Sequence, residues 1–330
     1  MIKNKKKSPE ITVVICTYNS EETISLSIKS ILNQTLSFRE LIVIDDNSQD
    51  KTLNIITKIS KKEKRLKVKS NSKNEGIAYC RQLGLEMAKG QLISFLDSDD
   101  IADKKMLESQ FNLIKKDKKI IGVGCYSYYC DKNYNILGIQ KIGPTSKKEF
   151  LEIYKKNKLT FILPTTMFRK ELAISVGGYR KYVDNKKSKR TQDYSEDLDL
   201  WNRLSDLGQD GFYFLTIPRP LFKYRKTEDS LTSRGLWIMQ QKIFWIKDCL
   251  LKRRNNEIQL TFAEYEQSIS IIQKISNLRL YFGTFLYRKS IYSFLKKNWI
   301  LFFLTFLSSF LISPNVIFKK LYKSKILFLK

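Results

Sequence analysis

The stretch Leu92-Ile-Ser-Phe-Leu-Asp-Ser-Asp-Asp100 decides the fold of this chain. Its first five residues are almost wholly apolar, which predicts a β-strand that is buried on both faces of a sheet. The strand ends abruptly in three carboxylates, those of Asp97, Asp99 and Asp100. Because ligands of open α/β sheets gather beyond the carboxyl ends of the strands, these carboxylates are well placed to hold a divalent cation.

A purely structural role is the alternative for the same aspartates. A helix is expected over residues 106–114, and Asp100 or Asp103 would then accept backbone hydrogen bonds at its N-terminus. A bare Asp-x-Asp sequence is common by chance, so the neighbouring segments must decide between the two interpretations.

The upstream segments repeat the pattern of an apolar run followed by a polar break. Strands are expected at residues 11–16, 41–44 and 66–68, and a helical pattern follows each of them. This alternation predicts an α/β fold with a mostly parallel central sheet and helices on its faces.

Helix ends are also indicated by local residue types. Asn19 and Glu22 have the spacing of a capping box for the first helix. The second helix is expected at about residues 52–60, and the third over 74–89, where Gly90 would end it.

The polar residues that follow the strands should share one edge of the sheet, so we expect them to form a single site. They are Thr17, Asp45, Asp46, Asp97 and Asp99. No G-x-G-x-x-G follows the first strand and no P-loop sequence occurs, which argues against a dinucleotide-binding fold or a P-loop. A nucleotide would instead be bound by side chains and a metal ion.

The composition narrows the chemistry further. The chain has 330 residues, enough for one large domain with an appendage, and it contains no histidine. Histidine-based triads, histidine-ligated zinc and histidine general bases are therefore excluded. Any metal would be bound by oxygen atoms, which favours Mg²⁺ or Mn²⁺.

Net charge and cysteine content say less about the function of the chain. The net charge of +27 suits nucleic acid, an anionic membrane surface or phosphate-bearing ligands, but much of it is dispersed lysine. The five cysteines form no C-x-x-C pair and are expected to be small core residues in a reducing compartment. The basic residues 1–7 lead directly into a strand, so no signal peptide is expected.

Six motifs in order make the chain resemble family 2 glycosyltransferases with the GT-A fold. The resemblance covers about residues 8–230. The motifs are Val13-Val-Ile-Cys-Thr-Tyr-Asn19, Leu41-Ile-Val-Ile-Asp-Asp-Asn-Ser-Gln-Asp50, Asn74-Glu-Gly-Ile-Ala-Tyr-Cys-Arg81, Phe95-Leu-Asp-Ser-Asp-Asp100, Gly177-Gly-Tyr179 and Glu196-Asp-Leu-Asp-Leu-Trp201.

The resemblance implies an inverting sugar transfer from a nucleotide-sugar donor. Thr17 and either Asp45 or Asp46 would hold the nucleobase and ribose, and Asp99, with Asp97, would bind the metal. The implied donor-binding residues are Thr17, Tyr18, Asn19, Asp45, Asp46, Arg81 and Asp97.

The resemblance makes Asp197 the catalytic base, with Glu196 as a secondary candidate. Physical chemistry agrees, because an attacking hydroxyl must lose a proton and a diphosphate leaving group needs its developing charge offset. Both carboxylates open an expected helix whose apolar face is Leu198, Trp201 and Leu204. The alternative is that they merely stabilise the helix N-terminus electrostatically.

Other segments have weaker assignments. The polar and basic residues 181–190 are expected to form a loop that acts as a lid. Arg225 or Arg234 would contact phosphate, although solvated arginines are the simpler interpretation. The acceptor side is expected between residues 101 and 163.

The character of the sequence changes near residue 235, which predicts a catalytic domain over 1–234 and a helical extension over 235–330. Helices are expected at 237–251, 262–280 and 281–295. The Q-x-x-R-W motif of processive synthases in the resembled family is absent, which favours addition of a single sugar over polymerisation.

An apolar segment at about 299–318 predicts attachment to a membrane. Its uninterrupted part, 299–312, would be about 21 Å long as a helix, short of a hydrocarbon core of about 30 Å. Lysines flank it on both sides, so we expect either a helix in the interface or a hairpin turning near Ser313-Pro314, on the inner face of the plasma membrane. The alternative is a core helix of a helical unit.

These observations predict a cytoplasmic, membrane-associated glycosyltransferase. Its donor would be a UDP- or dTDP-linked sugar, its cofactor Mg²⁺ or Mn²⁺, and its acceptor a lipid-linked or surface-polysaccharide glycan. A sugar-nucleotide-binding homologue without activity is one alternative, and a nucleotidyltransferase on a similar sheet is another. A basic nucleic-acid-binding protein is a third, but no nucleic-acid motif supports it and nucleic acid is not an expected partner.

Overall fold

The structure is a computed structural model that describes residues 9–180, 193–226, 235–295 and 297–318. The predicted loop 181–190, Arg234 and the tail beyond residue 318 lie outside the described residues. The chain forms two compact units, Met1–Ser230 with Ile246–Glu257, and Leu231–Trp245 with Ile258–Lys330. The domain boundary predicted at residue 234 lies outside the described part and stays a prediction.

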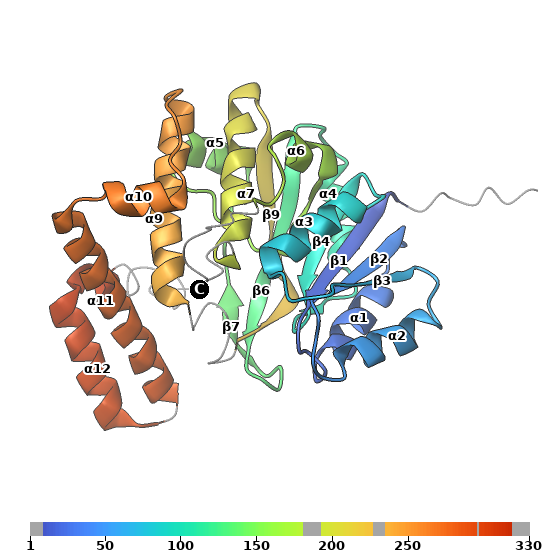
Figure 1. Cartoon of the computed structure of the whole chain (residues 1–330), viewed down its shortest axis with the longest axis horizontal. Helices are drawn as coiled ribbons and strands as arrows, with labels where there is room; N and C mark the ends of the chain where they lie inside the picture. The colour runs from blue at the N-terminus through green and yellow to red at the C-terminus, as the bar shows by residue number, and fades with distance from the viewer. Residues whose placement is uncertain (1–8, 181–192, 227–234, 296, 319–330) are drawn as a thin grey trace, which may run out of the picture. The chain divides into compact units, whose positions relative to one another are not determined.

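The first unit is built on one mixed sheet, most of whose strands are labelled in Figure 1. In the described residues its strand order is β3-β2-β1-β4-β8-β6-β9-β5, with β7 paired to β6. The strands are β1 (Ile11–Thr17), β2 (Glu40–Asp45), β3 (Leu66–Ser70), β4 (Leu92–Asp97), β5 (Ile101–Ala102), β6 (Ile120–Cys130), β7 (Ile136–Gln140), β8 (Met167–Arg169) and β9 (Tyr213–Arg225).

The first four strands confirm the predicted parallel arrangement. β1 pairs in parallel with β2 and β4, and β2 pairs in parallel with β3. β8 then pairs antiparallel with β4 and β6. The long pair β6 and β9 is again parallel, so the sheet is mixed beyond β4.

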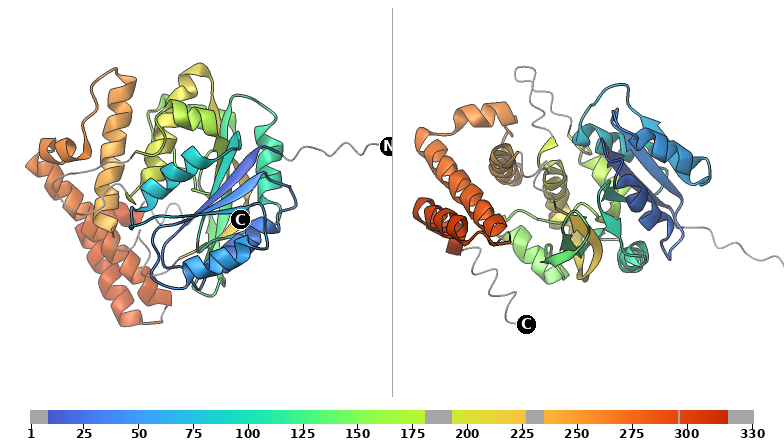
Figure 2. Two further views of the ribbon diagram at one scale, coloured as in Figure 1. Left: turned by 45° about the vertical axis from the view of Figure 1, so that its right-hand side comes forward. Right: turned by 90° about the horizontal axis from the view of Figure 1, so that it is seen from below.

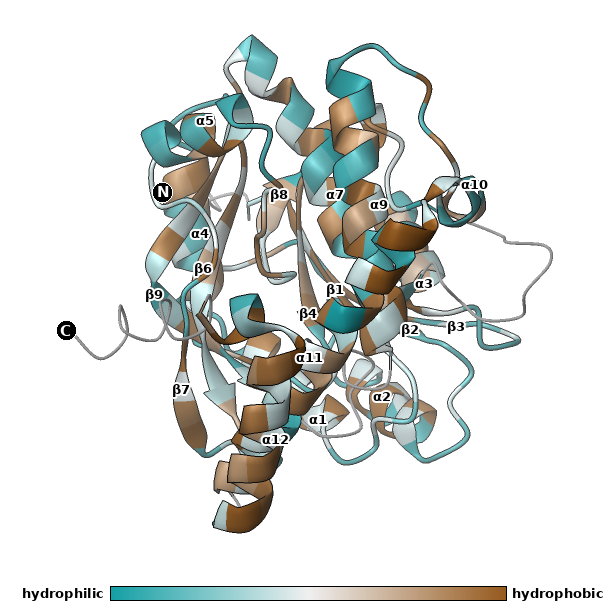
Figure 3. Ribbon diagram, turned by 90° about the vertical axis from the view of Figure 1, so that its left-hand side faces the viewer, coloured by the Kyte–Doolittle hydropathy of each residue, from teal (hydrophilic) through white to brown (hydrophobic). Residues whose placement is uncertain are grey.

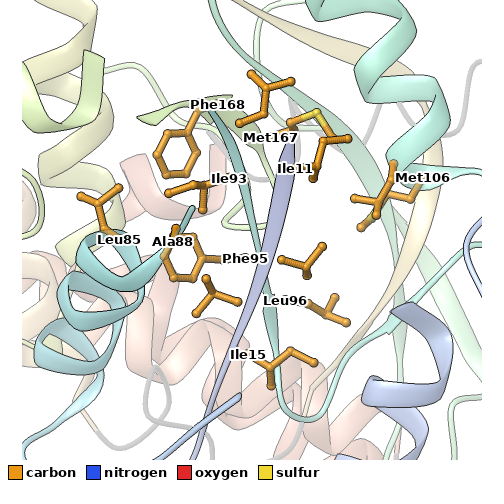
Figure 4. Packing of buried hydrophobic residues seen from close by; sticks show 14 of the residues in the cluster. Ile11, Ile15, Leu85, Ala88, Ile93, Phe95, Leu96, Met106, Met167 and Phe168 are labelled. Atoms are coloured by element: carbon orange, nitrogen blue, oxygen red, sulfur yellow. The ribbon is translucent and has the colours of Figure 1, made fainter. Parts of the chain in front are cut away.

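Helices cover both faces of this sheet, as the views in Figure 2 allow the reader to follow. Figure 4 shows Leu85 of α3 (Ile77–Met87) and Ala88, the residue after that helix, on one side of β4, and Met106 of α4 on the other. The helices of the first unit are α1 (Ile24–Leu32), α2 (Thr52–Ser60), α3 (Ile77–Met87), α4 (Met106–Ile114), α5 (Lys147–Lys155), α6 (Lys170–Ser175) and α7 (Glu196–Ser205).

The core explains why the central strands read as continuous apolar runs. Every residue of β1 and β2 is buried, because helices pack on both faces of the sheet. Aromatic rings continue the core toward α7: Phe95 stacks on Phe168, which meets Trp201 edge to face. The predicted apolar face of the helix that begins at Glu196 is thus confirmed, with Trp201 fully buried.

Two predicted helix ends are wrong. Asn19 and Glu22 form no capping box, because α1 begins only at Ile24, after Thr23, which makes no side-chain cap bond. Asn19 instead has a left-handed backbone (φ 48°), and its side-chain oxygen accepts a hydrogen bond from the Gln49 amide.

Gly90 does not end α3, which stops at Met87 with Ala88 as the C-terminal cap residue. Glycine is required at position 90 for another reason: a Cβ there would lie 2.6 Å from the backbone nitrogen of Thr12. Neither Asp100 nor Asp103 is the cap residue of α4, which is Lys105, although Oδ1 of Asp103 accepts a hydrogen bond from the Lys105 amide at 2.8 Å.

All five cysteines are free and buried, which confirms their expected place in the core.

The second unit is helical. It contains the N-terminal part of α9 (Leu236–Arg254), together with α10 (Phe262–Ser268), α11 (Ile271–Leu295) and α12 (Trp299–Ile312). The chain breaks between α10 and α11 at Ile269 and Ser270, rather than at residue 280 as predicted.

α11 and α12 lie side by side as a hairpin (Figure 1). α11 ends at Leu295 and α12 begins at Trp299. The turn predicted near Ser313-Pro314 concerns residues 299–318 and the tail that follows, which lies outside the described residues, so it stays a prediction. Among the described residues, no helix combines the length and the apolar character needed to cross a bilayer.

Candidate active site

The carboxyl ends of the parallel strands bring the predicted polar residues to one edge. Thr17 is paired in register with Asp45, and Asp45 with Ser70. On the other side of β1, Asp97 is paired with Cys16, one residue before Thr17. The expectation that these residues share an edge is confirmed by this register, whereas their roles in binding stay predictions.

Arg81 of α3 connects two of the motifs. Its Nη2 lies 2.9 Å from Oδ1 of Asp97 at the end of β4, and its Nη1 lies 2.7 Å from Oε1 of Glu196 at the start of α7. The guanidinium is buried, with a side-chain exposure of 6%. Planar guanidinium groups suit such two-sided pairing, so Arg81 fixes α7 relative to the strand that ends in Asp97.

Carboxylates outnumber cations around Arg81. Burial by itself would lower the pKa of Arg81, but Glu196 and Asp97 raise it well above its ordinary value, so the guanidinium stays charged. Burial, and then the charge of Asp197, raise the pKa of Glu196 to about 8. Burial, with a contribution from Asp97, also raises the pKa of Asp197. Both groups are therefore stronger bases than ordinary carboxylates.

α7 is held by the turn that contains Gly177 and Gly178. Both glycines have positive φ angles, 87° and 62°, which favour glycine. Arg203 of α7 donates hydrogen bonds to the carbonyl oxygens of Val176 and Gly178, and its Nε lies 3.0 Å from Oδ2 of Asp199. The turn and the helix are thus joined by one buried arginine.

The turn also reaches α3 and β4. The amide of Tyr179 donates to Oε1 of Gln82 at 2.8 Å, and the Tyr179 ring meets Phe95 edge to face. The Gly177-Gly-Tyr179 motif therefore joins α7 to α3, the helix that carries Arg81.

Asp46 organises the segment that leads into α3. Its Oδ1 accepts from the side chain of Asn71 at 2.7 Å and the amide of Glu75 at 2.9 Å, and its Oδ2 accepts from the amide of Gly76 at 2.8 Å. Both carboxylate oxygens are therefore engaged by the protein.

Asp193 is a site residue that the sequence did not indicate. Its Oδ1 accepts a hydrogen bond from the amide of Ala78, in the first turn of α3, at 3.0 Å. A Cβ on Gly76 would lie only 2.3 Å from Oδ2 of Asp193. No local signal relates residues 115 positions apart, so this contact had to come from the structure.

Asp45 and Thr17 are buried, and each has an oxygen without a partner among the described residues. Oδ2 of Asp45 accepts from the amide of Ser48 at 3.2 Å and the hydroxyl of Ser70 at 3.3 Å, but its Oδ1 and Oγ1 of Thr17 have no hydrogen bond. Buried polar atoms are rarely left unpaired, so a ligand is one way to satisfy them. Tyr18, next in the chain, is 47% exposed.

The three aspartates that end β4 have different surroundings. Asp97 pairs with Arg81, and Asp100 is fully buried, with its Oδ1 accepting from the backbone amide of Arg225. Asp99 forms no ion pair within the described part of the chain, and burial together with the Asp97 charge raises its pKa to about 6. Asp100 therefore joins the end of β4 to β9, and Asp99 is the one of the three aspartates that makes neither an ion pair nor such a bond in the part of the chain that the structure describes.

These residues fit an oxygen-bound divalent ion in part. Repulsion between the Asp97 and Asp99 carboxylates is the condition that a bound cation relieves. No group of three or more acidic or cysteine side chains that could hold a metal occurs within residues 9–180, 193–226, 235–295 and 297–318. A metal bound here would find at most the carboxylates of Asp97 and Asp99 among the described side chains, and other ligands would have to come from a bound substrate.

The Arg225 side chain bonds to residues other than Asp97, Asp99 and Asp100. Its Nε donates to the carbonyl of Lys132 at 3.1 Å, and its Nη2 lies 3.9 Å from Glu22. The Tyr134 hydroxyl, which the sequence did not indicate, donates to the carbonyl oxygen of Asp99 at 3.0 Å. A phosphate contact of Arg225 stays a prediction, and Arg234 lies outside the described residues.

Comparison with known proteins agrees with this geometry. The profile of the family described as "Glycosyl transferase family 2" matches residues 12–177. A glycosyltransferase of Haemophilus influenzae is 33% identical over 219 residues, which are 66% of this chain and 65% of that protein. The UDP-Glc:alpha-D-GlcNAc-diphosphoundecaprenol beta-1,3-glucosyltransferase WfaP of Escherichia coli is 34% identical over 129 residues, 39% of this chain and 50% of WfaP. The chain thus spans less than two thirds of the length of these relatives.

Solved structures confirm the predicted GT-A fold. TarS residues 1–349 of Staphylococcus aureus, in complex with UDP-GlcNAc, have a TM-score of 0.55 and 18% sequence identity, over 90% of both chains. The mannosyltransferase PcManGT of Pyrobaculum calidifontis, in complex with GDP-Man and Mn²⁺, has a TM-score of 0.51 and 16% identity, over 75% of this chain and 65% of PcManGT.

Proposed function

This chain belongs to glycosyl transferase family 2, and we propose that it transfers a sugar from a UDP- or dTDP-linked donor to a hydroxyl of a lipid-linked or surface-polysaccharide acceptor, with inversion. The observation that carries the proposal is the double pairing of Arg81. It places the strand end that carries Asp97 beside the helix start that carries Glu196 and Asp197. The transfer needs carboxylates that bind a metal ion for the leaving diphosphate and a carboxylate that accepts the proton of the incoming hydroxyl, and both must lie at one site.

The proposed general base is Asp197. Burial raises its pKa, which makes it a better proton acceptor than a solvated aspartate. One base is sufficient, because an inverting transfer forms no covalent intermediate with the protein. Glu196, engaged by Arg81, then orients the helix start and is the second candidate for the base.

The proposed donor contacts begin at Thr17 and Asp45. Their unpaired oxygens are suited to hydroxyl and amide hydrogen-bond donors such as those of ribose and a uracil or thymine base. Of the two aspartates, Asp45 is favoured over Asp46, because both oxygens of Asp46 already accept backbone or side-chain hydrogen bonds. Tyr18 and Asn19 are the exposed residues next to these atoms.

A Mg²⁺ or Mn²⁺ ion held by Asp99, with Asp97, would supply electrostatic stabilisation of the diphosphate leaving group. Support comes from the donor set of two carboxylates and from the Mn²⁺ complex of PcManGT, which shares the fold. The lipid-linked acceptor and the inner face of the plasma membrane are proposed because WfaP is named for a diphosphoundecaprenol acceptor.

A thermal-shift screen of nucleoside-diphosphate sugars, with and without Mn²⁺, tests the donor assignment. A ligand at 100 times its dissociation constant stabilises the folded state by about 2.7 kcal/mol, so the correct donor should raise the Tm clearly. We expect UDP- or dTDP-sugars to do so and GDP-sugars not to. A chain that responds to none of them, with or without the metal, would contradict the proposed activity.

The metal assignment has its own variant. Asp99→Ala should abolish the Mn²⁺-dependent part of UDP or dTDP binding, measured by calorimetry, while the unfolding transition is kept. Asp103→Ala is the matched control, because this nearby aspartate is exposed and its Oδ1 accepts a hydrogen bond from the amide of Lys105. Equal nucleotide affinity in the Asp99 variant and the wild type would remove Asp99 from the metal site.

A further inference from the structure

The buried residues of the α11–α12 hairpin are small or polar. They are Asn277, Gly283, Ser290, Ser293, Thr305 and Ser309. The hydroxyl of Ser309 donates to the carbonyl of Gly283 at 2.7 Å, and a Cβ on Gly283 would lie 2.5 Å from that of Ser313. Small residues therefore bring the two helix backbones close together, as they do between helices in lipid.

Most large apolar side chains of the same helices are exposed, and the others that the structure describes are half-buried. No large apolar side chain of α11 or α12 is buried among those that the structure places. Exposed residues form one stripe on each helix at helical spacing: Ile271, Ile275, Leu278, Phe282 and Phe285 on α11, and Ile300, Phe303, Leu304, Leu307 and Leu311 on α12. Figure 3 shows both helices largely in the brown of hydrophobic residues.

This arrangement is the reverse of that in a helix pair surrounded by water. Such a pair buries its large apolar residues and exposes polar ones, and extended apolar patches on a protein surface mark contact sites. Exposed fractions of 79% for Ile300 and 70% for Leu311 show how completely these side chains lie outside the hairpin.

The charges of this region identify the occupant of the surface. The sequence has no Asp or Glu after Glu266, while basic residues recur along the hairpin and beyond it. On α11, Lys274 and Arg279 lie on opposite sides of the apolar stripe. Basic side chains beside an apolar stripe fit an anionic lipid surface, because the stripe enters the acyl boundary while the charges reach the headgroups.

We propose that the α11–α12 hairpin lies in the plane of an anionic membrane, with its two apolar stripes among the lipid chains. The length of α12, 14 residues or about 21 Å, is too short for a crossing. α11 is longer but carries Arg279 and the pair Arg288-Lys289, which a membrane-crossing helix would have to bury. The inference deepens the proposed function, since it names the surface that brings the enzyme to a lipid-borne acceptor.

Flotation of the purified full-length chain with vesicles tests the proposal. Wild type should bind vesicles that contain phosphatidylglycerol more tightly than vesicles of phosphatidylcholine alone, and the difference should shrink in high salt. The double variant Leu304→Glu/Leu307→Glu should partition roughly tenfold more weakly or worse, since each carboxylate must leave the apolar surface and the anionic headgroups.

The control is the double variant Leu137→Glu/Ile174→Glu, whose residues are 56% and 53% exposed, close to the 60% and 56% of Leu304 and Leu307. It should bind vesicles as the wild type does. Equal losses in both variants, or no loss in the hairpin variant, would overturn the proposal. A stable dimer in sedimentation that ignores vesicles would also overturn it, because a second copy would then cover the stripes.

Tryptophan fluorescence of the wild-type chain tests the same proposal without relying on the folding of the glutamate variants. Trp299 is 52% exposed at the start of α12, so its fluorescence should be quenched by lipids brominated near the headgroup, and Trp299→Phe should remove that quenching. Strongest quenching by bromines at the bilayer centre would show a crossing and reject an in-plane hairpin. No donor or acceptor is present in these assays, so transfer to a soluble acceptor analogue reports separately on the proposed function.

Discussion

Asp197 and Glu196 are adjacent in the chain but have unequal contacts. Glu196 lies 2.7 Å from Nη1 of Arg81, whereas no ion pair is formed by Asp197 within the described residues. Asp197 is favoured as the base because its only hydrogen bond among the described residues is accepted from the Leu198 amide at 2.7 Å, whereas Glu196 is engaged by Arg81 in joining α7 to the end of β4. This difference, which the sequence motif alone does not contain, is the reason for choosing between two adjacent acids.

Asp197→Asn should keep donor binding and lose transfer by about 10²-fold or more, because the amide has the same shape but cannot accept the proton of the hydroxyl. Initial rates at saturating donor and calorimetric donor affinity are the two measurements. Asp210→Asn, at an exposed position in the 3-10 turn after α7, is the control and should transfer normally. A rate within about tenfold of wild type would move the base, most directly to Glu196.

Glu196 also predicts how stability depends on pH. Its pKa is raised from 4.5 to about 8 on folding, so the folded state binds the proton more tightly than the unfolded chain does. The contribution of this group is therefore fully present below about pH 4.5 and is lost as the pH rises toward 8. In Glu196→Gln that loss should be absent, so the Tm of the variant should rise relative to wild type between pH 5 and pH 8. A constant Tm difference across this range would contradict the raised pKa.

At the scale of elements, the segment that leads into α3 is closely packed. Gly76 has a φ of 95° and no room for a Cβ, because Asp193 occupies that space while it accepts from the first turn of the helix. Movement here would shift Arg81, which is on the same helix, and with it both of the acidic groups that it joins.

Gly76→Ala should therefore destabilise the chain more than its backbone angle alone requires. Gly211 separates the two effects: its φ is 79°, but no atom lies within 4 Å of the position a Cβ would take. Gly211→Ala should lower the free energy of unfolding by about 1–2 kcal/mol, the penalty of a left-handed alanine. Gly76→Ala should lower it further and weaken donor binding, both measurable by denaturant titration and calorimetry. Equal penalties would show that Asp193 moves aside freely.

Local pattern predicted the elements well and their junctions poorly. Apolar runs and strand–helix alternation were sufficient to predict β1 to β4, because a strand that is buried on both faces consists almost entirely of apolar residues. Asn19 failed as a cap because its side chain bonds to a loop 30 residues away. The bonds of Arg81, Arg203 and Asp193 also join distant segments, so a motif can name these residues without saying what they touch.

At the scale of the whole molecule, the predicted topology keeps the lysines on both sides of residues 299–312 on one side of the membrane. A cysteine added after Lys330 tests this. An impermeant maleimide should leave it unlabelled in intact cells and label it once the cells are opened, because a single crossing would carry one basic cluster outward. Labelling from outside would show that the tail crosses.

The native cysteines of the folded chain should react little with thiol reagents, because they are buried. All five thiols are enclosed, and burial raises the pKa of Cys125 to about 12 and that of Cys249 to about 11, so little thiolate is available to an alkylating reagent. One introduced cysteine can then carry a dye, a spin label or a crosslinker at a chosen position. Global unfolding would expose all five thiols to the reagent at once. The rate at which the chain gains the mass of five thiol adducts therefore measures the rate of global unfolding.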